Sequence, residues 1–264
     1  MVSIRTLPLS NPSDLDLYEA IDIIEAAVPA RTDIKVFNIS FGPKGQILDD
    51  TISRFTHALD LLAVTHKITF CVAVGNDGDI PENRIQSPSD AVHSLGIGAY
   101  TVRGGKQLRA PYSCKGPGRE GAKIKPDVVA FGGCTISPIH LISTISGKKA
   151  LAHGTSFASP IAGSLCALAH GLYDRATALL TRCLITHTAT HPSGDPDHDF
   201  GHGCIAANVD DVLRAPNNAV TVAYQGQLSP KSFYKLVIPL PEKIELPGNV
   251  EIYSAPQKLD RWFR

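Results

Sequence analysis

The sequence has no net charge and no long hydrophobic run, and these two absences exclude several classes of protein. Its 264 residues carry 25 Lys and Arg against 25 Asp and Glu, so no excess of positive charge points to nucleic acid or to an anionic membrane. No apolar run approaches the roughly 20 residues that span a bilayer, and the first residues lack the apolar segment of a secretory signal. We therefore expect no nucleic-acid or membrane partner, and a cytoplasmic location is favoured.

Cysteine is present, but it is not arranged as a metal or redox site. The six cysteines include no Cys-x-x-Cys pair, which argues against a zinc ribbon or a redox motif. Cys71 and Cys166 lie in apolar stretches and are expected to be small core residues. The stretch 191–202 is rich in His and Asp but lacks the regular spacing of a metal site. We expect no cofactor and no metal.

Hydrophobic periodicity predicts helices that alternate with strands over the first 214 residues. Alternating helices and strands are typical of a parallel sheet covered by helices on both faces, so the expected fold class is α/β. The pattern places Ile52 on the buried face of one helix, and Leu179, Leu180, Cys183 and Leu184 on that of another. Helices are predicted over 13–28, from about 50, over 156–170 and from about 174, and strands over 34–40, 68–74, 94–101 and 126–130.

The pattern changes after Arg214. Short strands separated by Gly, Pro and Ser are predicted over 219–224, 233–240 and 249–253, without helical periodicity. Three strands cannot close a β-sandwich, which takes about seven. We therefore expect two domains, an α/β domain over 1–215 and a β-rich segment over 216–264 that is an incomplete β-sandwich domain.

Two loops at the ends of predicted strands carry residues suited to catalysis. Functional sites in open parallel sheets form at the carboxyl ends of the strands, and Val74-Gly-Asn-Asp-Gly78 follows one strand. His153-Gly-Thr-Ser-Phe157 places Ser156 at the start of a helix, where backbone N–H groups are unpaired and favour negative charge. A serine at this place can attack a carbonyl group while its own N–H holds the resulting oxyanion.

The residues around Ser156 resemble the signature of the subtilisin-like serine peptidases. Gly154-Thr-Ser-Phe-Ala-Ser-Pro160 is similar to the G-T-S-[MF]-A-[ST]-P motif of that family. Val36-Phe-Asn-Ile-Ser-Phe-Gly42 resembles its cleft strand, V-I-N-M-S-L-G, and Val72-Ala-Val-Gly-Asn76 resembles its A-A-G-N segment. Phe131 stands where the family usually has proline, and Ala206 where it has asparagine. Later family motifs are matched, in the right order, by 112–117, 125–130, 188–190 and 200–207.

The resemblance covers about residues 1–214 and implies a fold, an activity and a set of site residues. It implies a subtilisin-like parallel sheet between helices, and hydrolysis of polypeptides through an acyl-enzyme on Ser156. Asn76 is implied as the side-chain donor to the oxyanion. The implied substrate-binding residues, which pair with an extended peptide or lie at its side-chain pocket, are Ser40, Phe41, Gly42, Ala73, Val74, Gly75 and Gln86.

The sequence departs from the family where the other two catalytic residues are expected. The family's Asp, in D-[ST]-G, and its His, in H-G-T-H, both precede the cleft strand. The 33 residues before Ile34 contain neither motif, and the first histidine is His57. We expect the chain to correspond to the C-terminal two-thirds of a catalytic domain, to be inactive alone, and to require a missing N-terminal segment or chain that supplies Asp and His. The alternative is an inactive pseudo-peptidase, or a gene fragment, that at most binds peptides.

Asn38-Ile-Ser40 also matches the sequon for N-glycosylation. The motif lies in a predicted buried strand. We therefore expect Asn38 to be buried and unmodified.

Overall fold

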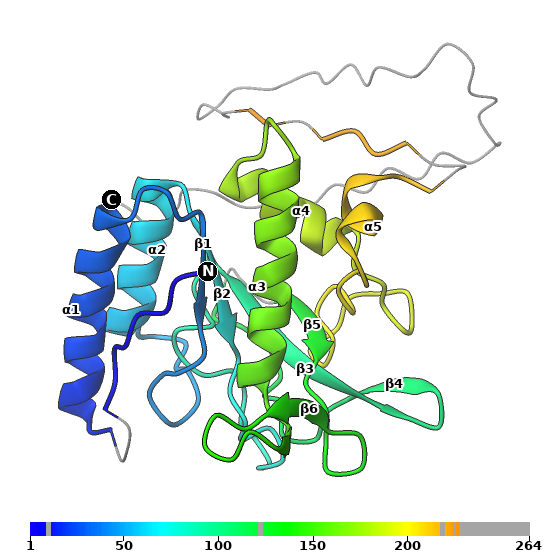
Figure 1. The fold of residues 1–264 in the computed structure, drawn as a ribbon, viewed down its shortest axis with the longest axis horizontal. Coiled ribbons are helices and arrows are strands. Elements are labelled where there is room, and N and C mark those ends of the chain that lie inside the picture. The colour runs from blue at the N-terminus through cyan, green and yellow to red at the C-terminus, as the bar shows by residue number, and fades with distance from the viewer. Residues whose placement is uncertain (9–11, 121–123, 217–219, 224, 227–264) are drawn as a thin grey trace. The chain divides into compact units, whose positions relative to one another are not determined.

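A computed structural model of the chain describes residues 1–8, 12–120, 124–216, 220–223 and 225–226 (Figure 1). The chain divides into two compact units, Met1–Leu213 and Arg214–Arg264. All helices and strands of the described residues lie in the first unit. Residues 220–223 of the predicted strand over 219–224 form no strand, and the strands predicted over 233–240 and 249–253 lie outside the described residues. The division into an α/β domain and a β-rich domain stays a prediction.

The first unit is built on a mainly parallel sheet, as the sequence predicted. Strand β1 pairs with β2, β2 with β3, and β3 with β5, all in parallel. The end of β3 also pairs with β4 as an antiparallel hairpin. Strands β6 and β7 form a separate antiparallel pair. The sequence analysis did not identify β4, β6 or β7. The strands are β1 (Val36–Ile39), β2 (Thr69–Ala73), β3 (Leu95–Arg103), β4 (Lys106–Arg109), β5 (Val128–Phe131), β6 (Ile139–Ile142) and β7 (Lys149–Ala152).

Helices cover the two faces of the sheet in separate groups (Figure 1). Alternation along β2 shows this: Phe70 and Val72 pack in a cluster with α1 and α2, whereas Cys71 packs in a cluster with α3 and α4. Since successive side chains of a strand point to opposite faces, the two helix groups lie on opposite sides. The helices are α1 (Asp14–Ala30), α2 (Arg54–His66), α3 (Thr155–Leu172), α4 (Ala178–His187) and α5 (Val209–Leu213).

Two helices begin later than the periodicity predicted, because capping side chains fix their starts. Ser53 accepts the N–H of Thr56 before α2, and Thr177 accepts the N–H of Leu180 before α4. Ile52 therefore precedes its helix and is 53% exposed, so its predicted burial is wrong.

The predicted buried face of α4 is also wrong in detail. Leu179, Leu180 and Cys183 are half-buried, whereas Leu184, also half-buried, packs against the core as predicted. Arg182 is among the fully buried residues of α4, and its guanidinium donates to the Val92 carbonyl at 3.3 Å. A charged side chain with a partner that is distant in sequence gives no hydrophobic signal. The fully buried positions of α4 are Ala178, Thr181, Arg182 and Ile185.

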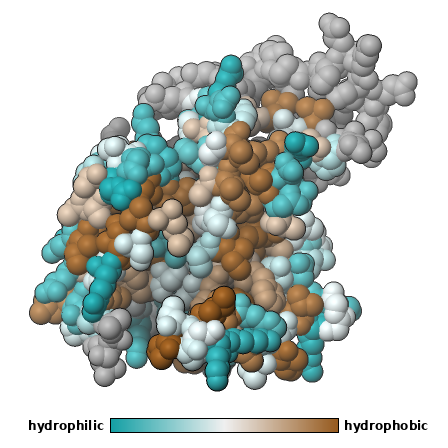
Figure 2. All heavy atoms as spheres, in the orientation of Figure 1, coloured by the Kyte–Doolittle hydropathy of each residue, from teal (hydrophilic) through white to brown (hydrophobic). Residues whose placement is uncertain are grey.

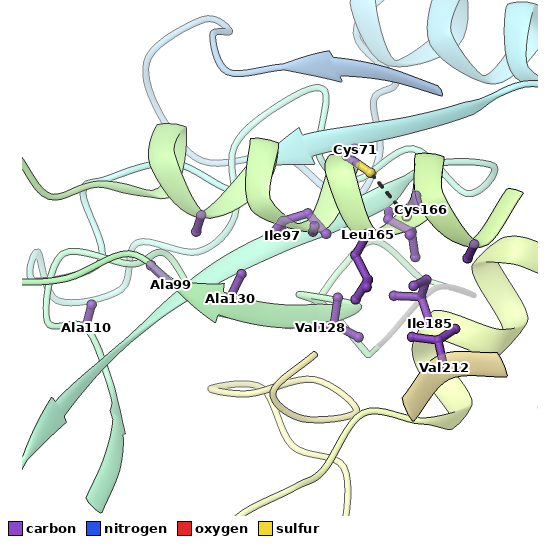
Figure 3. Packing of buried hydrophobic residues seen from close by; sticks show 14 residues of the cluster. Cys71, Ile97, Ala99, Ala110, Val128, Ala130, Leu165, Cys166, Ile185 and Val212 are labelled. Carbon is purple, nitrogen blue, oxygen red and sulfur yellow. Dashed lines mark hydrogen bonds between the residues drawn. The ribbon is translucent and has the colours of Figure 1, made fainter. Parts of the chain in front are cut away.

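The core beneath α3 is filled by small and branched side chains (Figure 3). Cys71 of β2 and Cys166 of α3 are fully buried there with their sulfur atoms 3.7 Å apart. Both are free thiols, as expected of core cysteines. Gly163 sits over Cys71, where a Cβ would lie 3.8 Å from the cysteine Cβ. These small residues let α3 approach the sheet closely.

The surface of the first unit includes several exposed hydrophobic side chains on the face that α3 crosses (Figure 2). On α3 itself, Ile161, Leu168 and Leu172 are between 40% and 61% exposed. In the described part of the chain, no helix has the length and apolar character needed to cross a membrane.

Candidate active site

Ser156 is the second residue of α3 and lies at the helix N-terminus. The preceding N-cap, Gly154, has a φ of 151°, a backbone conformation that favours glycine. Its N–H donates to the Gly132 carbonyl at 3.0 Å, which fixes the turn from β7 into α3. Within the described residues the N–H of Ser156 has no hydrogen-bond partner. This N–H is therefore available to an anion, as the helix start predicts.

Ser156 is bonded reciprocally to Ser40, the residue that follows β1. The Ser156 hydroxyl donates to the Ser40 carbonyl, and the Ser40 hydroxyl donates to the Ser156 carbonyl, each at 3.2 Å. Residues 116 positions apart in the sequence are thus brought into direct contact, as the predicted site requires. Both side chains are half-buried.

Asn76 lies against the residue that precedes Ser156. Its Oδ1 accepts both the N–H and the hydroxyl of Thr155, each at 2.9 Å. Because two donors fix the oxygen on the Thr155 side, the Nδ2 of the exposed Asn76 is turned away from Thr155. Asn76 follows β2 and Ser40 follows β1, so both come from the carboxyl ends of adjacent parallel strands. The sequence analysis did not identify Thr155 as the residue that orients Asn76.

Gln86, which the family resemblance implies lies at a side-chain pocket, packs directly on Gly75. Gly75 has a φ of 106°, and a Cβ there would collide with the Gln86 side chain. The Gln86 Nε2 donates to Asp77 Oδ2 at 2.6 Å. The side chain of Gln86 is therefore fixed between this loop and the strand end.

The other predicted substrate-binding residues lie around the ends of β1 and β2. The ring of Phe41 packs on Phe55 with centroids 5.6 Å apart. A side chain at Gly42 would collide with the Ser87 carbonyl. Val74 is fully buried, and its N–H and carbonyl are both bonded within the fold, whereas Ala73 is half-buried at the end of β2.

Tyr112 supports the turn before Ser156, a role that the sequence analysis did not assign. Its hydroxyl lies 2.8 Å from the carbonyl oxygens of both Gly132 and Gly133. Burial raises the pKa of Tyr112 to about 12, so the phenol keeps its proton as a donor. Its ring also packs on His153, with centroids 5.3 Å apart.

No general base contacts Ser156 within the described residues. The hydroxyl partner of Ser156 is a backbone carbonyl, which cannot accept a proton in catalysis. The described residues also contain no group of three or more His, Cys, Asp and Glu side chains that could hold a metal ion. The geometry therefore provides a serine, a free N–H and an oriented amide.

Comparisons with known proteins identify the family and the fold. The family model of the subtilase family matches residues 2–203, whereas no curated protein sequence matches the chain. Among solved structures, the "S41 Psychrophilic Protease" is similar with a TM-score of 0.60 and 22% identity, over 77% of this chain and 67% of that one. The prenylagaramide maturation protease PagA gives a TM-score of 0.57 and 21% identity, over 78% of this chain and 70% of that one.

A third structure belongs to a larger protein. Fervidolysin from Fervidobacterium pennivorans, described as a keratinolytic enzyme related to subtilisin, gives a TM-score of 0.55 and 24% identity. The match covers 74% of this chain, which spans 29% of that protein's length. These likenesses support the fold, and the family model covers most of the sequence. The chain belongs to the subtilase family of peptidases.

Proposed function

We propose that the chain is the nucleophile-bearing part of a serine endopeptidase, in which Ser156 attacks the carbonyl carbon of a peptide bond. The single observation that carries the proposal is the position of Ser156 at the start of α3 beside the oriented amide of Asn76. Attack forms a bond between Ser156 Oγ and the carbonyl carbon and moves an electron pair onto the carbonyl oxygen. The acyl-enzyme forms when the amine leaves, and water then releases the peptide acid.

Two donors of the site are suited to the developing oxyanion. The N–H of Ser156 is unpaired in the described residues, and Asn76 Nδ2 is turned away from Thr155. Donors that are fixed before the reaction need no reorganisation when charge develops on the oxygen. We assign Ser156 as the catalytic nucleophile and Asn76 as the oxyanion donor.

The predicted substrate contacts remain part of the proposal. A polypeptide in extended conformation is proposed to lie between Ser40-Phe41-Gly42 and Ala73-Val74-Gly75, with Gln86 at its side-chain pocket. Ser40 and Ala73 are half-buried at adjacent strand ends, which suits pairing with a peptide backbone. The backbone N–H and carbonyl of Val74 are already bonded within the fold. Val74 is therefore proposed to support the peptide site without pairing with the peptide backbone itself.

The base and its orienting carboxylate are proposed to come from a further polypeptide segment. The Ser156 hydroxyl points at the Ser40 carbonyl, and hydrolysis requires a group that removes its proton. A histidine brought to this hydroxyl, with an Asp behind it, completes the arrangement that the family resemblance implies. Without that segment, we expect weak hydrolysis of peptide amides.

A non-catalytic peptide-binding module is the second candidate. The observation in its favour is the same hydrogen bond from Ser156 to a carbonyl, with no base in contact within the described residues. In that case the cleft binds extended peptides, and Ser156 has no more reactivity than an ordinary serine.

The experiment is covalent labelling with a fluorophosphonate of the chain joined at its N-terminus to a subtilase segment that bears the D-[ST]-G and H-G-T-H motifs, which we call the extended chain. Intact mass and peptide mapping locate the label. We expect one phosphonyl group, on Ser156, with displacement of fluoride, and loss of labelling in Ser156→Ala. Ser164→Ala is the matched control, because Ser164 is an exposed serine of the same helix that donates to Ile161 at 2.8 Å. Absence of Ser156 labelling together with peptide binding would support the binding module instead.

A further inference from the structure

Asn38 connects β1 to the first turns of α3 through a continuous series of hydrogen bonds. The Ser159 hydroxyl donates to Asn38 Oδ1 at 2.7 Å, and Asn38 Nδ2 donates to the Ser40 hydroxyl oxygen at 2.9 Å. The Ser40 hydroxyl in turn donates to the Ser156 carbonyl at 3.2 Å. We call the four residues Ser159, Asn38, Ser40 and Ser156 the Asn38 bridge.

The bridge has a fixed direction, and this direction requires an amide at position 38. Each serine hydroxyl has one proton, so while Ser40 donates that proton to Ser156, its oxygen can meet Asn38 only as an acceptor. A side-chain amide accepts at one end and donates at the other, as Asn38 does. An aspartate of the same shape accepts at both ends, and it would draw the Ser40 proton away from Ser156.

Burial shows that these bonds, and not packing, hold the Asn38 side chain. Ser159 is fully buried, and a buried hydroxyl without a partner is costly. Asn38 is exposed, contrary to the burial expected from the sequence, so its orientation depends on its two partners. Removal of the amide would therefore leave Ser159 without its acceptor and Ser40 without its donor.

The consequence for Ser156 follows from the reciprocal contact with Ser40. The bridge holds the Ser156 carbonyl, while the Ser156 hydroxyl returns to the Ser40 carbonyl. The first turn of α3 is thereby attached to the carboxyl end of β1, along which the peptide is proposed to lie. We propose that Asn38 and Ser159 are positioning residues that hold Ser156 in place relative to a peptide bound along β1. This inference rests on the proposed function.

The test compares two substitutions that break the bridge in different ways. Asn38→Asp keeps the size and the acceptor for Ser159 but removes the donor to Ser40, whereas Ser159→Ala removes the other end. We expect each substitution in the extended chain to lower the second-order rate constant of Ser156 phosphonylation about tenfold or more, because small displacements of reacting groups are costly. The double variant is expected to be no slower than the slower single variant, because both act through one bridge.

A matched control separates positioning from loss of stability. Thr69 is a fully buried residue whose hydroxyl donates to the Ala178 carbonyl at 3.4 Å, so it also joins a strand to a helix. Thr69→Val removes that bond, in which no residue of the bridge takes part, and is expected to leave the phosphonylation rate unchanged. Hydrogen exchange is measured in parallel, and we expect faster exchange over 155–159 in Asn38→Asp but not in Thr69→Val.

The outcomes are decisive in each case. A slower reaction in both bridge variants, with the control unchanged, supports the inference. Rates equal to that of the unsubstituted chain, or an equal loss in Thr69→Val, would overturn it. If the unsubstituted extended chain is not labelled at Ser156, the proposed function fails, and hydrogen exchange alone decides the bridge: unchanged exchange over 155–159 refutes it, and faster exchange in the bridge variants supports it.

Discussion

At the scale of single residues, the site depends on side chains that fix the orientation of others. Thr155 turns the amide of Asn76 by donating twice to its oxygen, and Ser40 fixes both the carbonyl and the hydroxyl of Ser156. The motifs predicted Ser156 and Asn76 as site residues, and the structure brings both to the start of α3. Asn38 and Ser159 are 121 positions apart, and no local pattern in the sequence indicates such a pair.

Substitution of Asn76 tests the oxyanion donor. We expect Asn76→Ala and Asn76→Asp each to slow phosphonylation of Ser156 by about 100-fold or more, the size of effect known for such donors. Asn76→Asp keeps an acceptor for Thr155 and removes the Nδ2 donor, so it separates the two functions of the amide. Measured rates with a fluorophosphonate check the prediction.

Asn83→Ala is the control for the Asn76 variants. Asn83 lies in the same loop, and its Nδ2 donates to the Asp77 carbonyl at 3.2 Å, so its loss disturbs the loop without removing the proposed donor. We expect a near-normal rate. If Asn76→Asp reacted as fast as the unsubstituted chain, the amide would serve only to hold Thr155.

Cys134 is expected to be the most reactive of the six thiols. The Thr101 hydroxyl donates to its sulfur at 3.1 Å and lowers its pKa. Burial instead raises the pKa of Cys183. It also raises the pKa of Cys114 to about 11 and the pKa of Cys204 to about 12. Because the thiolate is the nucleophile, alkylation of Cys134 should begin at lower pH than that of Cys183, Cys114 and Cys204.

Alkylation by iodoacetamide as a function of pH, followed by peptide mapping, checks this order. Thr101→Val removes the donor, so the alkylation profile of Cys134 should shift to higher pH. Earlier modification of Cys183 than of Cys134 would contradict this order.

At the scale of elements, periodicity predicted the main strands and helices but not where every element begins. The helix starts after Ser53 and Thr177 are set by side-chain caps, which hydrophobic periodicity does not register. Strands β6 and β7 have mostly exposed or half-buried residues, so the alternation that predicts a strand is weak there. The long parallel core strand β2 was predicted well because four of its five residues are buried.

Removal of a helix cap gives a stability prediction at this scale. Ser53 accepts the Thr56 N–H at 3.0 Å and also lies against the Ser87 hydroxyl. We expect Ser53→Ala to lower the free energy of unfolding by about 1 kcal/mol, measured by urea denaturation. Ser164→Ala, a substitution within α3 away from its cap, should have a much smaller effect. Equal losses in the two variants would contradict a capping role for Ser53.

At the scale of the whole molecule, the chain carries a subtilase fold with an open sheet edge in its first unit. Strand β1 pairs with β2 on one side, and among the described residues no strand pairs with its other side. Unpaired strand edges promote association between chains, and α3 adds exposed hydrophobic residues. Alternating helices and strands in the sequence predicted the α/β class, and seven motifs in order indicated the family, but neither pattern shows how exposed these surfaces are.

We therefore expect the chain alone to self-associate at micromolar concentrations. Sedimentation velocity over a range of concentrations should show species larger than the 28.2 kDa monomer. A single monomeric species at all concentrations, with cooperative thermal unfolding, would show that this edge is protected.

The central claim is that Ser156 attacks a carbonyl group whose oxygen is held by Asn76 and by the Ser156 N–H. The most direct measurement is a crystal structure of the extended chain with a peptide boronic acid, which forms a tetrahedral adduct with a nucleophilic serine. The account predicts a bond between boron and Ser156 Oγ, with one boronate oxygen within hydrogen-bond distance of Asn76 Nδ2 and the Ser156 N–H. A trigonal boronate bound in the cleft, or an adduct whose oxygens make no contact with Asn76, would contradict it.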